Sequence, residues 1–241
     1  MTALITLSHG SRHPRAHAGI RRLTARAGAE LGIDAVDAHL EFNAPDLAGA
    51  VGALRGAGHS EATVVPLLFT RAFHATHDVP AALAVASGAG VRLTLAEGLG
   101  QGVDVVKLLA RRVPDDAHTI LYPVGTSNAP AAAATLRMGE RLAEITGQAV
   151  TVVPATGRGE LTGNEGIAAV ATRHQRVHLL PLFVTEGLLL DRAVAELEVI
   201  QQATGATITR SEPLGTDLSG IIAARYRAAR TESTGSQTCT G

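Results

Sequence analysis

The sequence predicts an α/β protein of two tandem similar lobes, each a mostly parallel sheet of about four strands with helices on both faces. Three observations predict this fold: a fixed displacement of 115 residues aligns the two halves, short β-rich runs alternate with helical stretches, and strands such as Val64-Val65-Pro66-Leu67-Leu68-Phe69 are continuous apolar runs rather than apolar/polar alternations. Continuous apolar runs are typical of strands whose two faces are both covered by helices. A chain of 241 residues is long enough for two such units.

The displacement of 115 residues pairs like residues without a gap along most of the chain. It aligns Gly10 with Gly125, Arg22 with Arg137, Gly32 with Gly147, His59 with His174, Pro66-Leu67 with Pro181-Leu182, and Leu99-Gly100 with Leu214-Gly215. Such self-similarity indicates a duplicated unit. We expect one lobe at 1–114, a second at 115–230 and a flexible tail at 231–241, with the join at Pro114-Asp115-Asp116.

The elements of the first lobe follow from its apolar runs and helix signals. We expect strands at 3–8, 35–41, 62–69 and 91–95, which alternate with helices near 14–31, 46–57, 79–88 and 101–112. Pro14 suits the first turn of the first helix, and Asn43 or Asp46 suits the cap of the second. The second lobe repeats the pattern, with strands near 118–124, 149–154, 176–184 and 206–210.

Composition excludes several classes of function. Apolar residues make up 46% and charged residues 18% of the chain, as in an ordinary globular protein rather than a disordered polymer. The net charge of −1 provides no broad positive field for nucleic acid, and aromatic residues at 2% provide no stacking platform for single strands. Cys239 is the single cysteine, so neither an intramolecular disulfide nor a cysteine-ligated cluster is expected.

The N-terminus lacks the basic segment of a signal peptide, and no run reaches the roughly 18 apolar residues of a membrane span. We therefore expect a cytoplasmic protein without membrane or nucleic-acid partners, as a monomer or homodimer.

Three polar residues of the first lobe follow strands of the predicted sheet. His9 ends the first strand, Glu41 ends the second, and His74 lies in the loop after the third. Ligands of α/β sheets bind at the carboxyl ends of strands, so these side chains are expected to share one site. Imidazole binds transition metals and accepts protons near neutral pH, so the set predicts a metal-handling acid/base site.

Each of these residues also has a structural interpretation. The His9 turn is equally typical of a helix cap with an anion-binding turn, Glu41 of an exposed strand end, and the His74/His77 pair of a cap on the next helix. Five further histidines are expected to be surface bystanders, namely His13, His17, His118, His174 and His178.

The two lobes differ at the candidate site. At the displacement of 115 residues, His9 becomes Val124, Glu41 becomes Thr156 and His74 becomes Leu189. The scaffold is retained while the polar triad is lost, which predicts one working site in the first lobe and a second lobe that forms the opposite wall of the cleft.

At these motifs the chain resembles the class II chelatases of the cobalamin and siroheme pathways, the CbiX/SirB sirohydrochlorin chelatase family. The resemblance rests on His9-Gly10-Ser11-Arg12-His13-Pro14, Leu40-Glu41-Phe42-Asn43-Ala44-Pro45, His74-Ala75-Thr76-His77-Asp78-Val79-Pro80, Gly125-Thr126-Ser127-Asn128 and Leu180-Pro181-Leu182-Phe183. It covers nearly the whole chain except the tail.

The resemblance implies a lyase-class enzyme that inserts a divalent metal into sirohydrochlorin and releases two protons. It makes His9 and His74 metal ligands and proton acceptors, with Glu41 assisting. The metal is a substrate, and no organic cofactor is implied. Fe²⁺ for siroheme is favoured over Co²⁺ for cobalamin, because this two-lobe form without appendages resembles the siroheme-linked members at least as much as the cobalamin-linked ones.

Sirohydrochlorin carries many carboxylates, which guanidinium groups bind in a forked geometry. Lys107 is the single lysine, so arginines are the available anchors, and Arg12, Arg15 and Arg71 stand nearest the motifs. The substrate-binding residues expected on this basis are Ser11, Arg12, Arg71, Leu68, Phe73 and Leu189.

Two other functions compete with this interpretation. A phosphate-ester enzyme would use the Gly10-Ser11 turn as an anion cradle and His9 as nucleophile, but it leaves Glu41 and the His74 loop without a role. A carrier of metal or tetrapyrrole would use the same ligands as a chelatase, and only turnover of free metal and macrocycle separates the two.

Overall fold

The computed structural model describes residues 2–70, 78–86, 88, 90–157 and 161–235. The first half of the chain contains β1 (Thr2–Ser8), α1 (Ala16–Leu31), β2 (Ala35–His39), α2 (Leu47–Gly56), β3 (Glu61–Pro66), α3 (Val79–Ala86), β4 (Arg92–Leu95) and α4 (Val103–Ala110). The second half contains β5 (His118–Pro123), α5 (Ala129–Thr146), β6 (Val150–Val152), α6 (Gly163–Ala171), β7 (Arg176–Leu182), α7 (Leu188–Thr204), β8 (Thr207–Arg210), the 3-10 helix η3 (Gly215–Leu218) and α8 (Ser219–Gly235).

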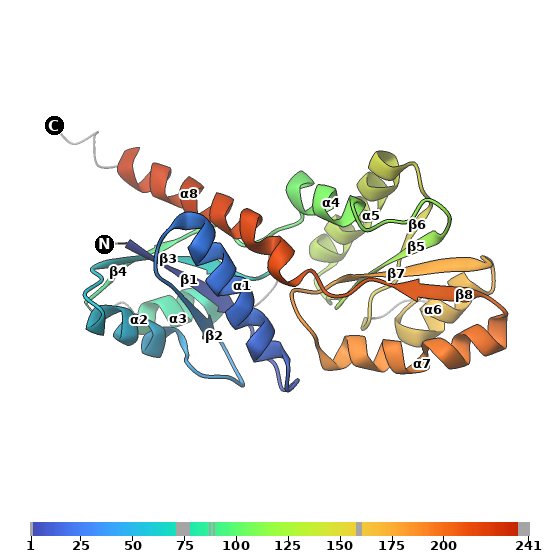
Figure 1. Ribbon diagram of the computed structural model, residues 1–241, viewed down its shortest axis with the longest axis horizontal. Coiled ribbons are helices and arrows are strands. Elements are labelled where there is room, and N and C mark those ends of the chain that lie inside the picture. The colour runs from blue at the N-terminus through green and yellow to red at the C-terminus, as the bar shows by residue number, and fades with distance from the viewer. Residues whose placement is uncertain (1, 71–77, 87, 89, 158–160, 236–241) are drawn as a thin grey trace. The chain divides into compact units, whose positions relative to one another are not determined.

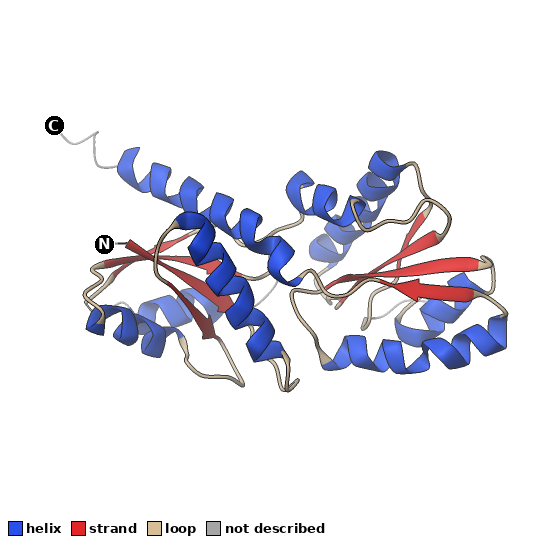
Figure 2. Ribbon diagram, viewed as in Figure 1, coloured by secondary structure: helices blue, strands red, loops and turns tan. Residues whose placement is uncertain are grey.

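These strands form two parallel four-stranded sheets, which confirms the predicted fold class. The strand orders are β2-β1-β3-β4 and β6-β5-β7-β8, so the second sheet repeats the topology of the first. Figure 2 shows helices on both faces of each sheet. The runs Val64-Val65-Pro66 in β3 and Leu179-Leu180-Pro181-Leu182 in β7 are continuously apolar because both faces of these central strands are buried against helices.

In the first unit, α1 and α8 lie on one face of the sheet, and α2 and α3 lie on the other (Figure 1). The core on the α2/α3 face contains Ala3, Ile5, Leu7, Ala38, Leu47, Ala50, Val51, Leu54, Ala62, Val64, Val79, Ala86 and Val91. Alternate residues of β1 point the other way, and the Thr6 hydroxyl hydrogen-bonds the Thr24 hydroxyl of α1 at 2.5 Å. The two faces of β1 therefore contact different helices.

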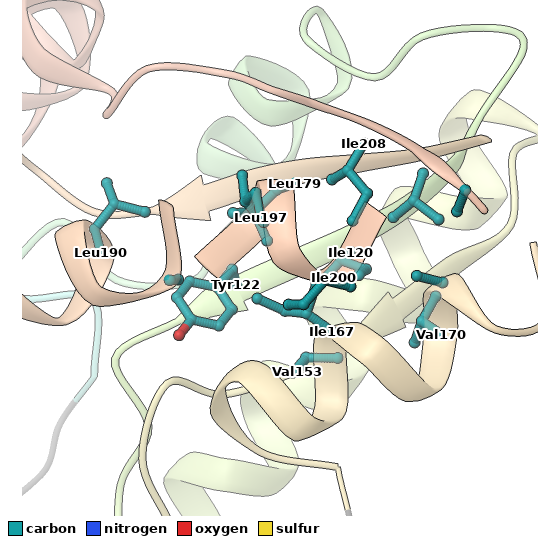
Figure 3. Close-up of a cluster of buried hydrophobic side chains, with 14 of the residues drawn as sticks. Ile120, Tyr122, Val153, Ile167, Val170, Leu179, Leu190, Leu197, Ile200 and Ile208 are labelled. Atoms are coloured by element: carbon teal, nitrogen blue, oxygen red, sulfur yellow. The ribbon is translucent and has the colours of Figure 1, made fainter. Parts of the chain in front are cut away.

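In the second unit, α4 and α5 lie on one face of the sheet, and α6 and α7 lie on the other (Figure 1). Figure 3 shows the core on the α6/α7 face, where Tyr122 lies among aliphatic side chains such as Ile120, Ile167, Leu179, Leu197 and Ile200. The Tyr122 and Phe183 rings stack with their centroids 6.2 Å apart. Burial raises the pKa of the Tyr122 hydroxyl.

The last helix of each repeat belongs to the compact unit that contains the sheet of the other repeat, so the unit bounds differ from those expected at 114 and 230. One compact unit comprises Met1–Gly100 with Gly215–Gly241, and the other comprises Gln101–Leu214. Helix α4 buries Val105, Val106 and Leu109 and packs on α5. The Arg112 guanidinium donates to the carbonyl oxygens of Glu212 (2.7 Å) and Leu214 (3.3 Å). These contacts assign α4 to the second unit.

Helix α8 makes the corresponding contacts in the first unit. It packs on α1, β3 and β4 through a face that includes the buried Ile222 and Tyr226. The Arg225 guanidinium donates to the carbonyl oxygens of Gly98 (3.0 Å) and Leu99 (2.9 Å). The helix ends at Gly235, so it includes the start of the expected tail, whereas residues 236–241 lie outside the described ones.

The duplication is visible in the turn that follows the first strand of each sheet. Gly10 and Gly125 have φ angles of 93° and 96°, a region that favours glycine. A Cβ at Gly10 would lie 1.8 Å from the carbonyl oxygen of Glu41, and a Cβ at Gly125 would lie 2.0 Å from that of Thr156. The same backbone approach therefore recurs at a displacement of 115 residues. Within the described residues, no helix combines the length and apolar character that crossing a membrane requires.

Candidate functional site

His9 and Glu41 lie side by side at the carboxyl ends of β1 and β2. The strands pair in register up to Ser8 and His39. Backbone pairing then continues past the strands, because the Leu40 N–H donates to the Ser8 carbonyl oxygen and the Glu41 N–H to the His9 carbonyl oxygen, both at 2.9 Å. The His9 side chain is half-buried, and that of Glu41 is exposed. The structure therefore brings these two predicted residues to one edge of the sheet.

The turn after His9 is held against the segment after Glu41. Its glycine, Gly10, permits the close approach of the two backbones. The Ser11 N–H donates to the Asn43 Oδ1 at 2.8 Å, and the Ser11 hydroxyl accepts from the His13 N–H at 3.1 Å. Ser11 thus has a structural role in this turn, and its contact with a substrate stays a prediction.

Phe42 is a residue of this site that sequence reasoning missed. Its φ angle is 63°, and its side chain is 52% exposed. Its ring lies parallel to that of His9, with centroids 6.0 Å apart and an interplanar angle of 9°. The Arg12 guanidinium carbon lies 4.6 Å from the Phe42 centroid. The one available signal was an aromatic residue directly after Glu41 in a chain with only four phenylalanines.

The backbone of Phe42 is strained because a side chain in the left-handed region costs about 1–2 kcal/mol. A cation–π contact at an exposed position returns about 0.5–1 kcal/mol. The Arg12 contact therefore offsets part of the strain but does not explain why an aromatic residue occupies this position. Strain of this kind clusters at ligand-binding sites.

The other predicted substrate-binding residues have different environments. Leu68 is half-buried and packs against the core of the first unit, whereas Leu189 packs against the core of the second unit. Packing accounts for both side chains, and their contact with a macrocycle stays a prediction. Residues 71–77, which include the predicted Arg71, Phe73 and His74, lie outside the described residues.

Several histidines expected to be surface bystanders are structural, which corrects that expectation. His13 is buried, and its Nδ1 accepts from the Arg15 N–H at 3.2 Å, just before α1. His178 is buried, and its two ring nitrogens hydrogen-bond the hydroxyls of Thr209 (2.8 Å) and Ser211 (2.9 Å). Burial lowers the pKa of His178.

His118 and His174 also belong to the second unit. Their rings stack with centroids 3.9 Å apart. Burial lowers the pKa of His118, and the charge on His174 lowers it further.

Known proteins and protein families are similar to this chain in part of its sequence and in its fold. Residues 3–116 match the CbiX family model. No curated protein matches the sequence significantly.

Among solved structures, SirB from Bacillus subtilis with Fe³⁺ aligns over 97% of this chain and 97% of its own, with a TM-score of 0.80 and 20% identity. A structure of the sirohydrochlorin chelatase SirB from Bacillus subtilis subspecies spizizenii with cobalt has the same coverage and identity and a TM-score of 0.75. A structure of CbiX, named as the terminal enzyme of siroheme biosynthesis in denitrifying bacteria, aligns over 95% of this chain and 99% of its own, with a TM-score of 0.64 and 21% identity. The chain therefore has the two-lobed fold of these proteins over nearly its whole length.

Proposed function

We propose that the protein is a chelatase that inserts a divalent metal ion into sirohydrochlorin and releases two protons. The observation that carries this proposal is the backbone pairing of Glu41 with His9 in a unit that matches the CbiX family model, which puts a histidine and a glutamate at adjacent positions on the carboxyl edge of the sheet. The SirB and CbiX structures of the same fold support it.

Metal insertion requires a base and a metal ligand at the same place. Two pyrrole N–H bonds break while the macrocycle nitrogens bind the cation, so two protons must leave as the ion arrives. The imidazole of His9 serves as ligand or proton acceptor, depending on the stage of the reaction. The exposed carboxylate of Glu41 passes protons on to solvent. His74 is the third member of this predicted set.

Phe42 and Arg12 fit the other part of the substrate. The exposed Phe42 ring offers an apolar surface to a planar macrocycle, since aromatic systems associate in offset-stacked arrangements. The neighbouring Arg12 guanidinium offers a forked donor to a macrocycle carboxylate. The shared position of an aromatic face and a cation favours a planar anionic substrate over a simple phosphate ester.

We propose Fe²⁺ as the metal, with Co²⁺ as the alternative, and no organic cofactor. Ligand identity does not separate the two ions, because they lie close together in the affinity order of divalent metals. Competition between the two ions in a single insertion assay ranks them.

The proposed role of the His74 loop is tested with two single variants. We expect His74→Ala to reduce metal insertion nearly to the uncatalysed rate while the unfolding midpoint stays unchanged. The matched variant His77→Ala is expected to retain most of the insertion rate. Near-normal turnover in His74→Ala would refute its assignment, and equal losses would place the metal on the His74/His77 pair. Metal and macrocycle binding without insertion by the wild-type protein would instead indicate a carrier.

A further inference from the structure

We propose that His17, Asp37 and His39 form a second binding site for a divalent transition-metal ion, separate from the site of His9 and Glu41. His17 lies in the first turn of α1, and Asp37 and His39 lie two residues apart on β2. Residues two apart on a strand share a face. Within the described part of the chain, this is the one group of three or more His, Cys, Asp and Glu side chains with ligand atoms close enough to share an ion.

The ligand atoms already lie near the spacing that a metal requires. The Asp37 Oδ2 lies 3.1 Å from the His17 Nε2 and 3.1 Å from the His39 Nε2. All three atoms lie within 4.8 Å of one another. With metal–ligand bonds of about 2.0–2.1 Å, tetrahedral geometry places neighbouring ligand atoms about 3.4 Å apart. Small side-chain movements therefore suffice to admit an ion.

Two imidazoles and one carboxylate select a class of ion. This ligand set suits Zn²⁺, Fe²⁺, Co²⁺ and Ni²⁺, whereas Mg²⁺ and Ca²⁺ prefer oxygen ligands throughout. Three protein ligands also leave coordination positions for water. The site thus takes the same class of ion as the proposed chelatase reaction.

His39 is held in place from its other nitrogen. Its Nδ1 lies 2.7 Å from the Ser8 hydroxyl, which also accepts from the Gly10 N–H at 3.2 Å. A proton on Nδ1, donated to Ser8, leaves the Nε2 lone pair for the metal, and histidine ligands are commonly oriented in this way. Without a metal, His39 takes its other tautomer, in which the proton lies on Nε2. The Nε2–H then donates to Asp37, and the Ser8 hydroxyl donates to Nδ1. The network accommodates both states.

The site is accessible to solvent on one side. His39 is 1% exposed as a side chain, whereas Asp37 is 15% and His17 is 36% exposed. Asp37 also lines a groove with Arg21 and Arg22, among others. The nearby positive charges weaken cation binding, so the ion is expected to exchange rather than to remain permanently bound.

The second repeat shows that the fold does not require this polar cluster. At the displacement of 115 residues, Asp37 corresponds to Val152, His39 to Pro154 and His17 to Ala132. Val152 lies in β6, the counterpart of β2, where its side chain packs close to Gly139 of α5. Apolar side chains therefore fill the equivalent place between helix and strand, and the polar cluster is specific to the unit that carries His9.

The test is Co²⁺ binding, measured by equilibrium dialysis and by visible ligand-field absorption with Co²⁺ as the only added ligand. The parents are the wild-type protein and His9→Ala, so that the proposed insertion site is perturbed separately. His17→Gln and Asp37→Asn are introduced into each parent. His39 is left unchanged because it is buried. The matched control is His59→Gln, which removes a separate His–Asp pair of this unit, His59 Nε2 to Asp34 Oδ2 at 2.8 Å.

We expect His17→Gln and Asp37→Asn to lose about one equivalent of Co²⁺ and the associated absorption in both parents, because three ligands define the site. His59→Gln should lose neither. Unchanged Co²⁺ binding in both cluster variants, or an equal loss in His59→Gln, would overturn the proposal. A parent His9→Ala that cannot insert metal yet retains the cluster-dependent Co²⁺ would separate this site from the proposed chelatase function.

Discussion

The Glu41 N–H donates to the carbonyl oxygen of His9 across 2.9 Å, one step beyond the last paired residues of β1 and β2. The approach depends on Gly10, where any Cβ would collide with the Glu41 carbonyl. Val124 and Thr156 form the same hydrogen bond in the second unit, at 3.0 Å. The backbone arrangement that pairs these two positions is thus common to both units, while the histidine and the glutamate occur in the first alone.

Gly10→Ala should destabilise the first unit much more than Gly32→Ala. Both glycines have positive φ angles, but a Cβ at Gly32 meets no atom within 4 Å, whereas one at Gly10 lies 1.8 Å from the Glu41 oxygen. We expect a cost of about 1 kcal/mol for Gly32→Ala and about 3 kcal/mol or more for Gly10→Ala, which must move the backbone. Urea unfolding of both variants measures the difference. Equal costs would show that the turn relaxes and that the close approach is dispensable.

Phe42→Asn should separate stability from substrate binding. Asparagine tolerates the left-handed region better than phenylalanine, so the free energy of unfolding should stay constant or rise by up to about 1 kcal/mol. Loss of the aromatic face should raise the KM for the macrocycle by about tenfold, the equivalent of roughly 1.4 kcal/mol. Steady-state insertion kinetics and urea unfolding provide the two readouts. An unchanged KM would show that Phe42 does not contact the macrocycle.

Acidification should destabilise the second unit through His118 and His178, whose pKa values are lowered mainly by burial. In the unfolded chain these residues titrate near 6.5. As the pH falls below that value, the unfolded state binds protons that the folded state does not, so stability is lost. The urea midpoint for unfolding of the wild-type protein should therefore decrease as the pH is lowered from 7.5 to 5.5. His178→Gln should show a smaller decrease over the same interval, and an identical pH dependence would contradict the assignment to His178.

The sequence alone predicted the succession of strands and helices along the chain, the repeat, and the positions of His9 and Glu41 at strand ends. These are local features of apolar runs and of the residues that follow them. The assignment of α4 to the unit of the second sheet, and of α8 to the unit of the first sheet, was not predictable in this way. A helical pattern reveals an apolar face, such as that of Val105 and Leu109, but not which sheet covers it. The expected boundary at 114 accordingly assigned α4 to the wrong unit.

The unexpected parts of the first unit depend on contacts between distant residues. Nothing in the sequence marks the positive φ angle of Phe42, since asparagine and glycine are the residues that usually signal it. The proximity of His17 to Asp37 arises only when α1 packs on β2, across twenty residues of chain. Residue spacing predicted neither feature, although it placed both segments correctly in a helix and a strand.

The central claim is tested most directly by anaerobic absorbance of sirohydrochlorin mixed with the purified protein and either Fe²⁺ or Co²⁺. Controls are a reaction without protein, the variant His9→Ala, and His174→Ala, which removes a histidine from the second unit. We predict accelerated conversion to the metallated product by the wild-type protein and by His174→Ala, and loss of the acceleration in His9→Ala. Binding without acceleration, or full activity of His9→Ala, would contradict the account.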